Sequence, residues 1–340
     1  MTWFTTYGPV QLQEQILRLG RRGGQLRPFC SSARVQNRSY SQRLQRVVVD
    51  FGTEHSFAKA AQRVREHYGI DVPVEAIRQH TLHHGRSIPQ LPIDVACPAK
   101  ILVAQMDGTM IPVVQPGAGP DARKGKQLLW REARLCLARP GDKAAALYGS
   151  TLGTAETAAW VWREVAISAG LDQKTHVHGL GDGAPWIVDK FRDNFAEHGS
   201  YLLDFYHVSE YSAQAATKIV RTGKAREWTR RQQGRLLNNQ SGKVLRSLQP
   251  HLEPPDAKEA PVSAAHRYLT ERQDCLDYLG ASSRNLPIGS GEIESGHRHV
   301  IQKRLKLAGG WWRETNAQAM LNLRTARANN QWHQYWMTQN

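Results

Sequence analysis

Three acidic side chains occupy positions in the sequence where an acid is uncommon. Asp107 interrupts an apolar run rich in branched residues, which is typical of a long buried strand over residues 101–114. Asp182 follows a second apolar run and stands between two glycines, and Glu294 comes shortly after a Gly-Ser-Gly sequence. A carboxylate in a buried strand costs free energy unless it is paired or binds a metal. These acids are therefore candidate catalytic or metal-binding residues.

If Asp107, Asp182 and Glu294 meet, their negative charges repel one another unless a cation joins them. Carboxylate oxygens are hard ligands, and they favour Mg²⁺ or Mn²⁺. Two such ions, about 3.5–4 Å apart, can activate a nucleophilic oxygen and stabilise the leaving oxygen of a phosphodiester. We therefore expect these three acids to be catalytic residues that bind two metal ions.

Each acid also has a plainer explanation. Asp107 and Asp182 each precede a glycine, and Asp-Gly is a common turn pair. Glu292 and Glu294 could serve only as acids at the start of a helix, where the helix dipole favours negative charge. The residue pattern does not decide whether Glu292 or Glu294 is the third ligand.

A histidine is the fourth candidate. His207 closes an Asp204-x-x-His sequence near the end of a predicted strand over residues 201–205. It could contact the scissile phosphate as a catalytic residue or orient a ligand, and a structural hydrogen bond is the alternative. Asp204 itself is expected to be structural.

The composition points to a polyanionic partner. The chain of 340 residues carries 45 Lys and Arg against 30 Asp and Glu, a formal charge of +15, which favours binding to nucleic acid over an ordinary solvated surface. Its four cysteines form no CxxC pair, so neither a disulfide framework nor a structural zinc site is expected. No apolar run approaches the ~20 residues that span a bilayer, and no signal pattern opens the chain. We expect a cytoplasmic protein with no membrane partner.

A helix-turn-helix is predicted within residues 41–86. Apolar residues spaced as in a helix begin at Leu44, Ser56 can cap a second helix that Gly69 ends, and Pro73 suits the first position of a third. A three-helix bundle without DNA contacts is the alternative. In the DNA-binding case, the third helix would present four side chains to a major groove: Arg78, Gln79, Thr81 and His83.

The rest of the chain predicts an α/β domain. Three consecutive strands with short connections imply an antiparallel meander, and the alternation of strands and helices that follows implies parallel pairing. This is the order of the RNase H-like mixed sheet, in which the strands of Asp107 and Asp182 are neighbours. The expected strands cover 101–114, 127–137, 144–148, 174–180 and 201–205, with helices over 154–170, 186–195 and from 206 to about 220. The expected domains are a basic arm over 1–40 with a short helix from Gln11 to Leu19, the helix-turn-helix over 41–86, a linker over 87–100, the catalytic domain over 101–222, a helical insertion over 223–284, and the completion of the catalytic domain over 285–340.

The completing segment is strongly basic. A helix from Glu292 to about Leu307 carries four cations suited to holding DNA phosphates beside the acids, although a solvated helix face is the alternative. Trp311 and Trp312 could stack on an unpaired base or pack in the core. The four cations are Arg298, Lys303, Arg304 and Lys306.

These motifs together resemble bacterial insertion-sequence transposases of the DDE type, most closely the Kra-type, Mutator-like group. The most specific part of the resemblance is Gly289-Ser290-Gly291 through Glu294-Ser295 together with Asp182-Gly183-Ala184-x-Trp186-Ile187; Asp107-Gly108-Thr109, Asp204-Phe205-Tyr206-His207 and Trp130-Arg131-Glu132-Ala133-Arg134 also match. The resemblance covers about residues 40–330.

The resemblance implies Asp107, Asp182 and Glu294 as the catalytic triad, and it favours Glu294 over Glu292. It implies a metal-dependent transposase, associated with the bacterial nucleoid, that binds the terminal repeats of its element on double-stranded DNA, cleaves there and joins the freed 3′-hydroxyl to target DNA. Cutting two ends suggests a homodimer or higher oligomer. An RNase H-like nuclease or resolvase without strand transfer, and a domesticated DNA-binding protein without catalysis, are the alternatives.

Overall fold

The computed structural model describes the whole chain except residues 19, 21–22, 34, 36–38, 93–94, 118–124, 142–144, 222 and 340. The chain divides into two compact units, which we describe separately. Unit 1 comprises residues 1–90, 111–131 and 299–340, and unit 2 comprises residues 91–110 and 132–298. This division cuts across the expected domains, because residues 299–340 belong with the N-terminal helices. Among the described residues, no helix is long and apolar enough to cross a membrane.

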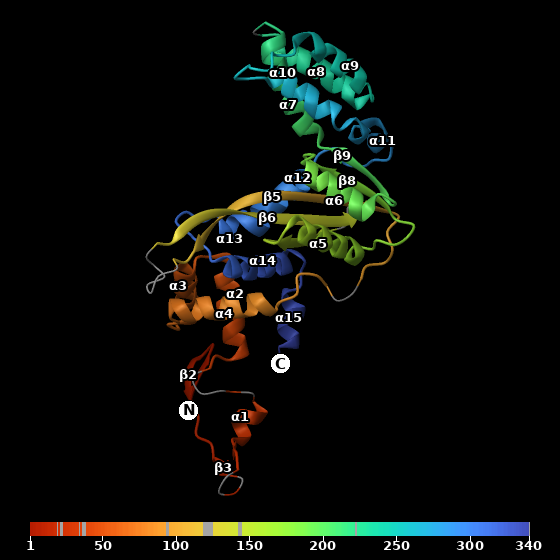
Figure 1. Ribbon diagram of the computed structural model, residues 1–340. Helices are drawn as coiled ribbons and strands as arrows, with labels where there is room; N and C mark the ends of the chain where they lie inside the picture. The colour runs from red at the N-terminus through yellow and green to blue at the C-terminus, as the bar shows by residue number, and fades with distance from the viewer. Residues whose placement is uncertain are drawn as a thin grey trace. The chain divides into compact units, whose positions relative to one another are not determined.

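A five-stranded mixed sheet organises unit 2 (Figure 1). Its strand order is β7-β6-β5-β8-β9, in which β8 pairs in parallel with both β5 and β9, and β7 pairs antiparallel with β6. Residues 111–115 of β5 and 127–131 of β6 are assigned to unit 1. The bounds are β5 Ile101–Gln115, β6 Gln127–Pro140, β7 Leu147–Thr151, β8 His176–Gly181 and β9 Gly199–Leu203.

Two helices bury one face of this sheet. Alternate residues of β5 point into a core shared with α5 (Ala155–Ser168) and α6 (Pro185–Phe195), where Trp162 stacks edge-on against Phe195. Thr154 caps α5 by accepting a hydrogen bond from the backbone of Thr157. A Cβ at Gly179 would lie 2.3 Å from the Phe191 ring, so α6 can approach β8 because this residue is glycine.

The strand boundaries differ from the prediction, and the third and last strands are shifted by two or more residues at both ends. The third strand was expected at 144–148, but β7 begins at Leu147, and Ala144 lies outside the described residues. The last strand ends at Leu203, because Asp204 caps the following helix and accepts hydrogen bonds from the backbone of Tyr206 and His207. His207 therefore lies in the first turn of a helix and not at the end of a strand.

The segment expected to be a helical insertion packs onto helix α7. Helix α10 lies along α7, which also contacts α8, and α9 packs on both α8 and α10 (Figure 1). The bounds are α7 Phe205–Ile219, α8 Ala225–Leu237, α9 Ser241–Leu248, η1 Gln249–His251, α10 Pro261–Thr270, η2 Gln273–Cys275 and α11 Tyr278–Ser283.

Unit 1 contains the three predicted helices. They are α2 (Gln42–Glu54), α3 (Phe57–Tyr68) and α4 (Val74–Ser87). Ser56 caps α3 through the backbone of Lys59, and Gly69 ends it with a φ of 65°, a conformation that favours glycine. Pro73 precedes α4 and does not open it.

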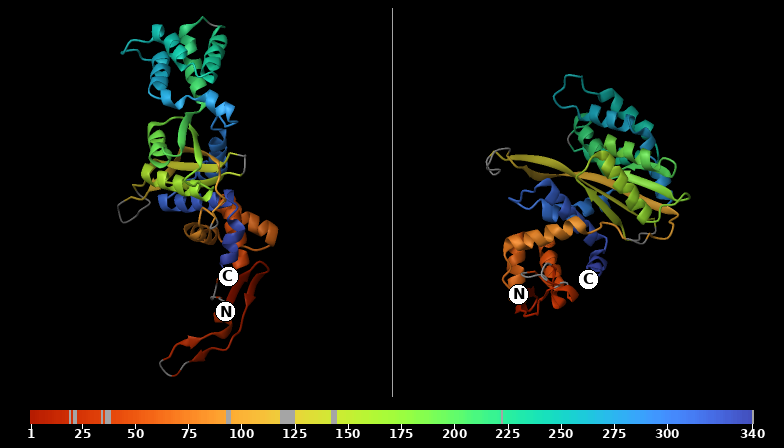
Figure 2. Two further views of the ribbon diagram at one scale, coloured as in Figure 1. Left: turned by 90° about the vertical axis from the view of Figure 1, so that its right-hand side faces the viewer. Right: turned by 60° about the horizontal axis from the view of Figure 1, so that its bottom comes forward.

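The N-terminal residues are not helical at the expected place. Strands β1 (Thr2–Thr5) and β2 (Gly8–Gln11) form an antiparallel hairpin, shown in red in Figure 2. The helix expected from Gln11 to Leu19 is wrong for the described residues, which hold the short strand β3. Two small elements follow in the chain. The remaining bounds are β3 Leu17–Arg18, β4 Gln25–Leu26 and α1 Pro28–Ser32.

The single helix expected over residues 292–307 is divided into α12 (Gly291–Gly296), a π-helical turn η3 (His297–Gln302) and α13 (Lys303–Leu305). The last helices, α14 (Glu314–Ala328) and α15 (Trp332–Thr338), belong to unit 1. Helix α14 packs closely on α4, where a Cβ on Gly85 would lie 2.4 Å from the carbonyl oxygen of Ala319.

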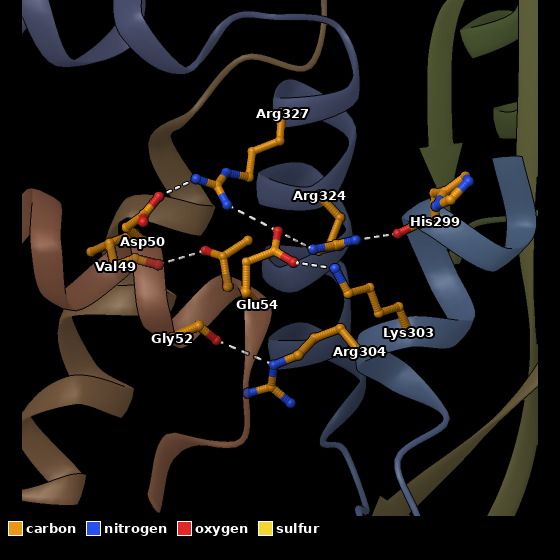
Figure 3. A network of polar contacts seen from close by, with 10 residues as sticks. Val49, Asp50, Gly52, Glu54, His299, Lys303, Arg304, Arg324 and Arg327 are labelled. Carbon is orange, nitrogen blue, oxygen red and sulfur yellow. Dashed lines mark hydrogen bonds and ion pairs between the residues drawn. The ribbon is translucent and has the colours of Figure 1, made fainter. Parts of the chain in front are cut away.

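One carboxylate joins these helices in unit 1 (Figure 3). Glu54, at the end of α2, accepts from Lys303 at 2.8 Å and from Arg327 at 2.9 Å, and it also pairs with Arg324. Burial by itself raises the pKa of Glu54, but the three cations outweigh this effect and lower the pKa to about 2. The carboxylate therefore remains charged at any pH above that value.

Replacing Glu54 with Gln is expected to lower the free energy of unfolding by about 3 kcal/mol at pH 7. The pKa of Glu54 is depressed on folding, so its contribution is present above about pH 4.5 and is lost as the pH falls towards 2. Urea unfolding of both proteins at pH 7, 4 and 2.5 should show the difference shrinking with acid. Glu66→Gln, which removes an exposed pair with Arg63, should cost less than about 1 kcal/mol. A difference between wild type and Glu54→Gln that does not change with pH would contradict this assignment.

Candidate functional site

A single pocket in unit 2 brings the predicted acids together. Its volume is about 220 Å³. Asp107 lies on β5, Asp182 directly follows the neighbouring parallel strand β8, and the register explains why they meet. Gln105 of β5 lies opposite Leu180 of β8, so each aspartate lies two residues further along its strand direction. The pocket is lined by Met106, Asp107, Gly181, Asp182, Asp204, Tyr206, His207, Glu210, Ser290, Ile293 and Glu294.

Asp107 lies within β5 and is only partly exposed. Its Oδ1 accepts a hydrogen bond from the backbone of Gly108 at 2.7 Å. Its Oδ2 lies 3.2 Å from Nε2 of His297, a side chain that is 3% exposed. The two groups are not aligned for a hydrogen bond, and neither ring nitrogen of His297 has a hydrogen-bond partner among the described residues. Asp107 therefore has an adjacent polar group whose hydrogen-bonding capacity is unused.

Asp182 lies in the loop between β8 and α6. Its Oδ1 accepts from the backbone of Ala184 at 2.9 Å, and Gly183 adopts a φ of 74°. Two side chains from the inserted helices hold this loop from outside: the Tyr268 hydroxyl donates to the Asp182 carbonyl at 2.5 Å, and Arg272 Nε donates to the Gly183 carbonyl at 2.8 Å. Burial raises the pKa of Tyr268, so its hydroxyl remains a donor. The insertion thus fixes the position of a predicted catalytic acid.

The structure separates the two glutamates. Glu294 lines the pocket with both aspartates and is exposed. Glu292 points elsewhere, because the buried guanidinium of Arg139 donates to its two carboxylate oxygens at 2.7 and 2.9 Å. Gln105 orders the start of the same helix, since its side-chain oxygen accepts from the backbone of Ile293 at 3.1 Å. The position of Glu294 makes it the candidate third ligand.

Asp204 connects the Gly-Ser-Gly loop to α7. It is 3% exposed, and its Oδ1 caps the helix through the backbone of Tyr206 at 2.6 Å and of His207 at 3.0 Å. Its Oδ2 accepts from the Ser290 backbone at 2.6 Å and from the Ser290 hydroxyl. All this hydrogen bonding gives Asp204 a structural role. The His207 side chain lines the pocket, with Nδ1 3.9 Å from Glu210 and its ring against Tyr211.

The donor set fits a hard divalent cation in its chemistry, because carboxylate oxygens of Asp107, Asp182 and Glu294 face one pocket. The arrangement is not that of a closed metal site. In the part of the chain that the structure describes, no three or more His, Cys, Asp or Glu side chains lie close enough together to hold a metal ion. Ligation by all three acids therefore requires side-chain movement.

The predicted DNA-binding residues lie in different surroundings. Arg298, in unit 2, is exposed, and so are Lys303 and Lys306 in unit 1, although Lys303 pairs with Glu54. Arg304 was expected on a charged helix face, but its side chain is buried, with 3% exposed. The structure also divides the two tryptophans, because Trp311 is 46% exposed and Trp312 only 7%.

The third helix of the predicted helix-turn-helix presents fewer side chains than expected. Arg78 is held by Glu75 at 2.6 Å, and Gln79 also donates to Glu75, at 3.0 Å. Thr81 is fully buried and donates to the Ile77 carbonyl, so its predicted place in a groove-facing set is wrong. Gln79 and His83 are exposed.

Sequence reasoning missed Tyr268, Arg272, Arg139 and His297. Only His297 left a usable signal, because it follows Glu294 by three residues, and residues so spaced on a helix share a face. The other three act through contacts with residues 86 to 153 positions away, which no local pattern encodes.

Comparisons with known proteins add little. No protein-family model matches the chain, and no curated protein matches it. Among solved structures, the chain is similar to a Drosophila P element transposase strand transfer complex, with 9% identity over 89% of this chain and 82% of that chain, and a TM-score of 0.30. Similarity at this level supports no argument about fold or activity.

Proposed function

We propose that this protein is a DNA transposase of an insertion sequence that cleaves phosphodiester bonds with a metal-dependent triad of Asp107, Asp182 and Glu294. One observation carries the proposal. Three acids that are separated by up to 187 positions in the sequence line a single pocket. The motif resemblance of the sequence to DDE transposases names the same three residues.

The sheet supports the finer fold assignment within this proposal. Its order, β7-β6-β5-β8-β9, is compatible with the RNase H-like arrangement, in which the first and fourth strands lie side by side. Strands β5 and β8 are the first and fourth strands of this sheet, and they carry Asp107 and the loop of Asp182. We infer an RNase H-like catalytic domain interrupted by the helices between α7 and α12.

The chain's own residues would prepare the reaction. Asp107, Asp182 and Glu294 would hold two Mg²⁺ or Mn²⁺ ions, which supply Lewis-acid activation of the attacking oxygen and charge stabilisation of the leaving oxygen when bound. Tyr268 and Arg272 would keep the Asp182 loop in place, and Asp204 would keep the Gly-Ser-Gly loop against α7. His207, on the pocket wall, would contact the scissile phosphate.

The charge of the chain supports DNA as the partner. The surplus of 15 positive charges favours long-range attraction to a phosphate backbone. Within unit 1, Gln79 and His83 are exposed on the helix predicted to enter the major groove, and Arg78 lies beside them. Binding of two element ends would be served by a homodimer or higher oligomer in the nucleoid.

The test is cleavage and joining of DNA cut from the ends of the element that encodes the protein. The purified protein should nick a duplex carrying an element end in the presence of Mg²⁺ and should join the freed 3′-hydroxyl to a target plasmid. EDTA should remove both activities, and Mn²⁺ should restore them. An absence of Mg²⁺-dependent cleavage on end-containing DNA would contradict the proposal.

Two outcomes would favour the alternatives. Cleavage without any joined product would make the protein an RNase H-like nuclease or resolvase. Tight, metal-independent binding to the element ends without cleavage would make it a domesticated DNA-binding protein. The open arrangement of the acids is compatible with this alternative.

A further inference from the structure

A second pocket, in unit 1, is lined by two residues whose buried hydrogen-bond donors lack acceptors among the described residues. Arg304 is 3% exposed and donates from Nε to the carbonyl of Gly52 at 3.2 Å. Its Nη2 is buried and has no hydrogen-bond partner among the described residues. Figure 3 shows the terminal nitrogens of Arg304 turned away from the Glu54 cluster. An unpaired donor on a buried charge is costly, so this group calls for an acceptor.

The neighbouring tryptophan has the same property. The Arg304 guanidinium lies 4.8 Å from the Trp312 ring centre and 4.7 Å from that of Phe57, between two aromatic surfaces. The indole nitrogen of Trp312 is buried and also lacks an acceptor in the described part of the chain. Two unpaired donors therefore belong to side chains in direct contact.

Both side chains line a pocket of about 470 Å³ that is positively charged. Arg304 and Arg313 line it together with Arg78, whose charge is paired with Glu75, and none of its described lining residues is acidic. The N-terminus of the 12-residue helix α3, capped by Ser56, also lies in its wall and adds the positive end of a helix dipole. The pocket is suited to an anion with several acceptor oxygens.

The pocket also offers a stacking surface. Trp311 lines it and keeps 46% of its surface exposed, whereas Trp312 is buried. An exposed indole beside an arginine cluster is the combination that binds a base together with its phosphate in single-stranded nucleic acid. A paired base inside a duplex has no free face to offer, so the arrangement favours an unpaired strand.

We propose that this pocket binds one unpaired nucleotide of a DNA strand, with the base stacked on Trp311 and the phosphate held by Arg304 and Trp312 after their side chains move to uncover the two buried donors. The inference deepens the proposed function, because an enzyme that cuts and joins strands must handle unpaired DNA ends. It places such a site in unit 1, in a pocket that contains none of the three acids.

The binding experiment uses the full chain and a fluorescent single-stranded 20-mer, followed by anisotropy over a salt series. Trp311→Ala should weaken binding between about 5-fold and 150-fold, which is the loss expected for one stacked base. Arg304→Lys keeps the charge but loses the forked donors, and should weaken binding about tenfold or more. Thermal unfolding checks that each variant folds, and Trp311→Ala keeps the test valid if Arg304→Lys does not fold.

Matched variants outside the pocket provide the controls. Trp160 is 63% exposed on α5, and Arg163 donates to a backbone carbonyl at 2.9 Å, so Trp160→Ala and Arg163→Lys make the same changes elsewhere. Both should bind the 20-mer within about twofold of wild type, since neither lies in a groove or pocket that contacts DNA in this proposal.

The outcomes separate this pocket from the catalytic proposal. Unchanged single-strand affinity in folded Trp311→Ala would overturn the pocket, and an equal loss on a blunt duplex would overturn its assignment to an unpaired strand. Tighter binding of an RNA strand of the same sequence would overturn DNA as the ligand. Loss of cleavage in Asp107→Asn together with unchanged single-strand binding in Trp311→Ala would overturn the pocket and leave the triad standing. Full cleavage in Asp107→Asn together with weakened single-strand binding in Trp311→Ala would overturn the triad and leave the pocket standing.

Discussion

Replacing Asp107 with Asn should reduce Mg²⁺-dependent DNA cleavage by at least about 10³-fold. Asn keeps the size of the side chain and an oxygen that can accept from Gly108, but it removes the negative charge that would bind a cation. Loss of metal-derived stabilisation is worth several kcal/mol in the transition state, and each 1.36 kcal/mol is about a tenfold change in rate. Single-turnover cleavage of an end-containing duplex measures the effect.

The same loss is expected for Asp182→Asn and Glu294→Gln. Glu197 is an exposed residue of the same unit, and Glu197→Gln makes the same acid-to-amide change away from the pocket. This matched control should leave the cleavage rate within about twofold of wild type. Glu292→Gln tests the choice between the glutamates: it should keep most of the activity, because Glu292 pairs with Arg139 and does not line the pocket. Full activity in Asp107→Asn, or a larger loss in Glu292→Gln than in Glu294→Gln, would contradict the triad.

The convergence of the acids could be predicted because the hydrophobic pattern of the sequence identifies the strands that position them. An apolar run identifies β5, a second identifies β8, and the parallel connection between them is limited to few arrangements. The capped start of α3 could also be predicted, since Ser56 satisfies a local backbone donor. The cap could be predicted because its contacts lie within a few residues in the chain, whereas the pairing of β5 with β8 followed from the alternation of strands and helices.

What could not be predicted depends on distant packing. Thr81 reads as a polar residue on a recognition helix, yet it is buried at the contact where a Cβ on Gly52 would meet its hydroxyl at 2.1 Å. Arg304 reads as one of several surface cations, yet Phe57, 247 positions earlier, covers it. His207 was misplaced because the cap formed by Asp204 ends β9 two residues earlier than the predicted strand over 201–205.

Replacing Asp204 with Ala should be the most destabilising of the substitutions considered, at about 3–5 kcal/mol. Four donors would lose their acceptor: the backbone of Tyr206 and His207, and the backbone and hydroxyl of Ser290. Each buried donor left unpaired costs about 1–3 kcal/mol, and partial relaxation reduces the sum. Urea unfolding with far-UV circular dichroism measures the change in free energy.

Two further variants separate the loss of unfolding free energy that is due to Oδ1 from that due to Oδ2 of Asp204. Asp204→Asn retains an oxygen for the cap of α7 but places an amide against the Ser290 donors, so it should be destabilised by an intermediate amount. Ser290→Ala removes only the hydroxyl and should cost about 1–2 kcal/mol, since its backbone bond to Asp204 remains. The hydrogen bonds of Asp204 join α7 to the loop before Glu294. Asp204→Asn should therefore lose cleavage even at temperatures where the variant is fully folded. Normal cleavage in that variant would show that the loop keeps Glu294 in place without the Asp204 hydrogen bonds.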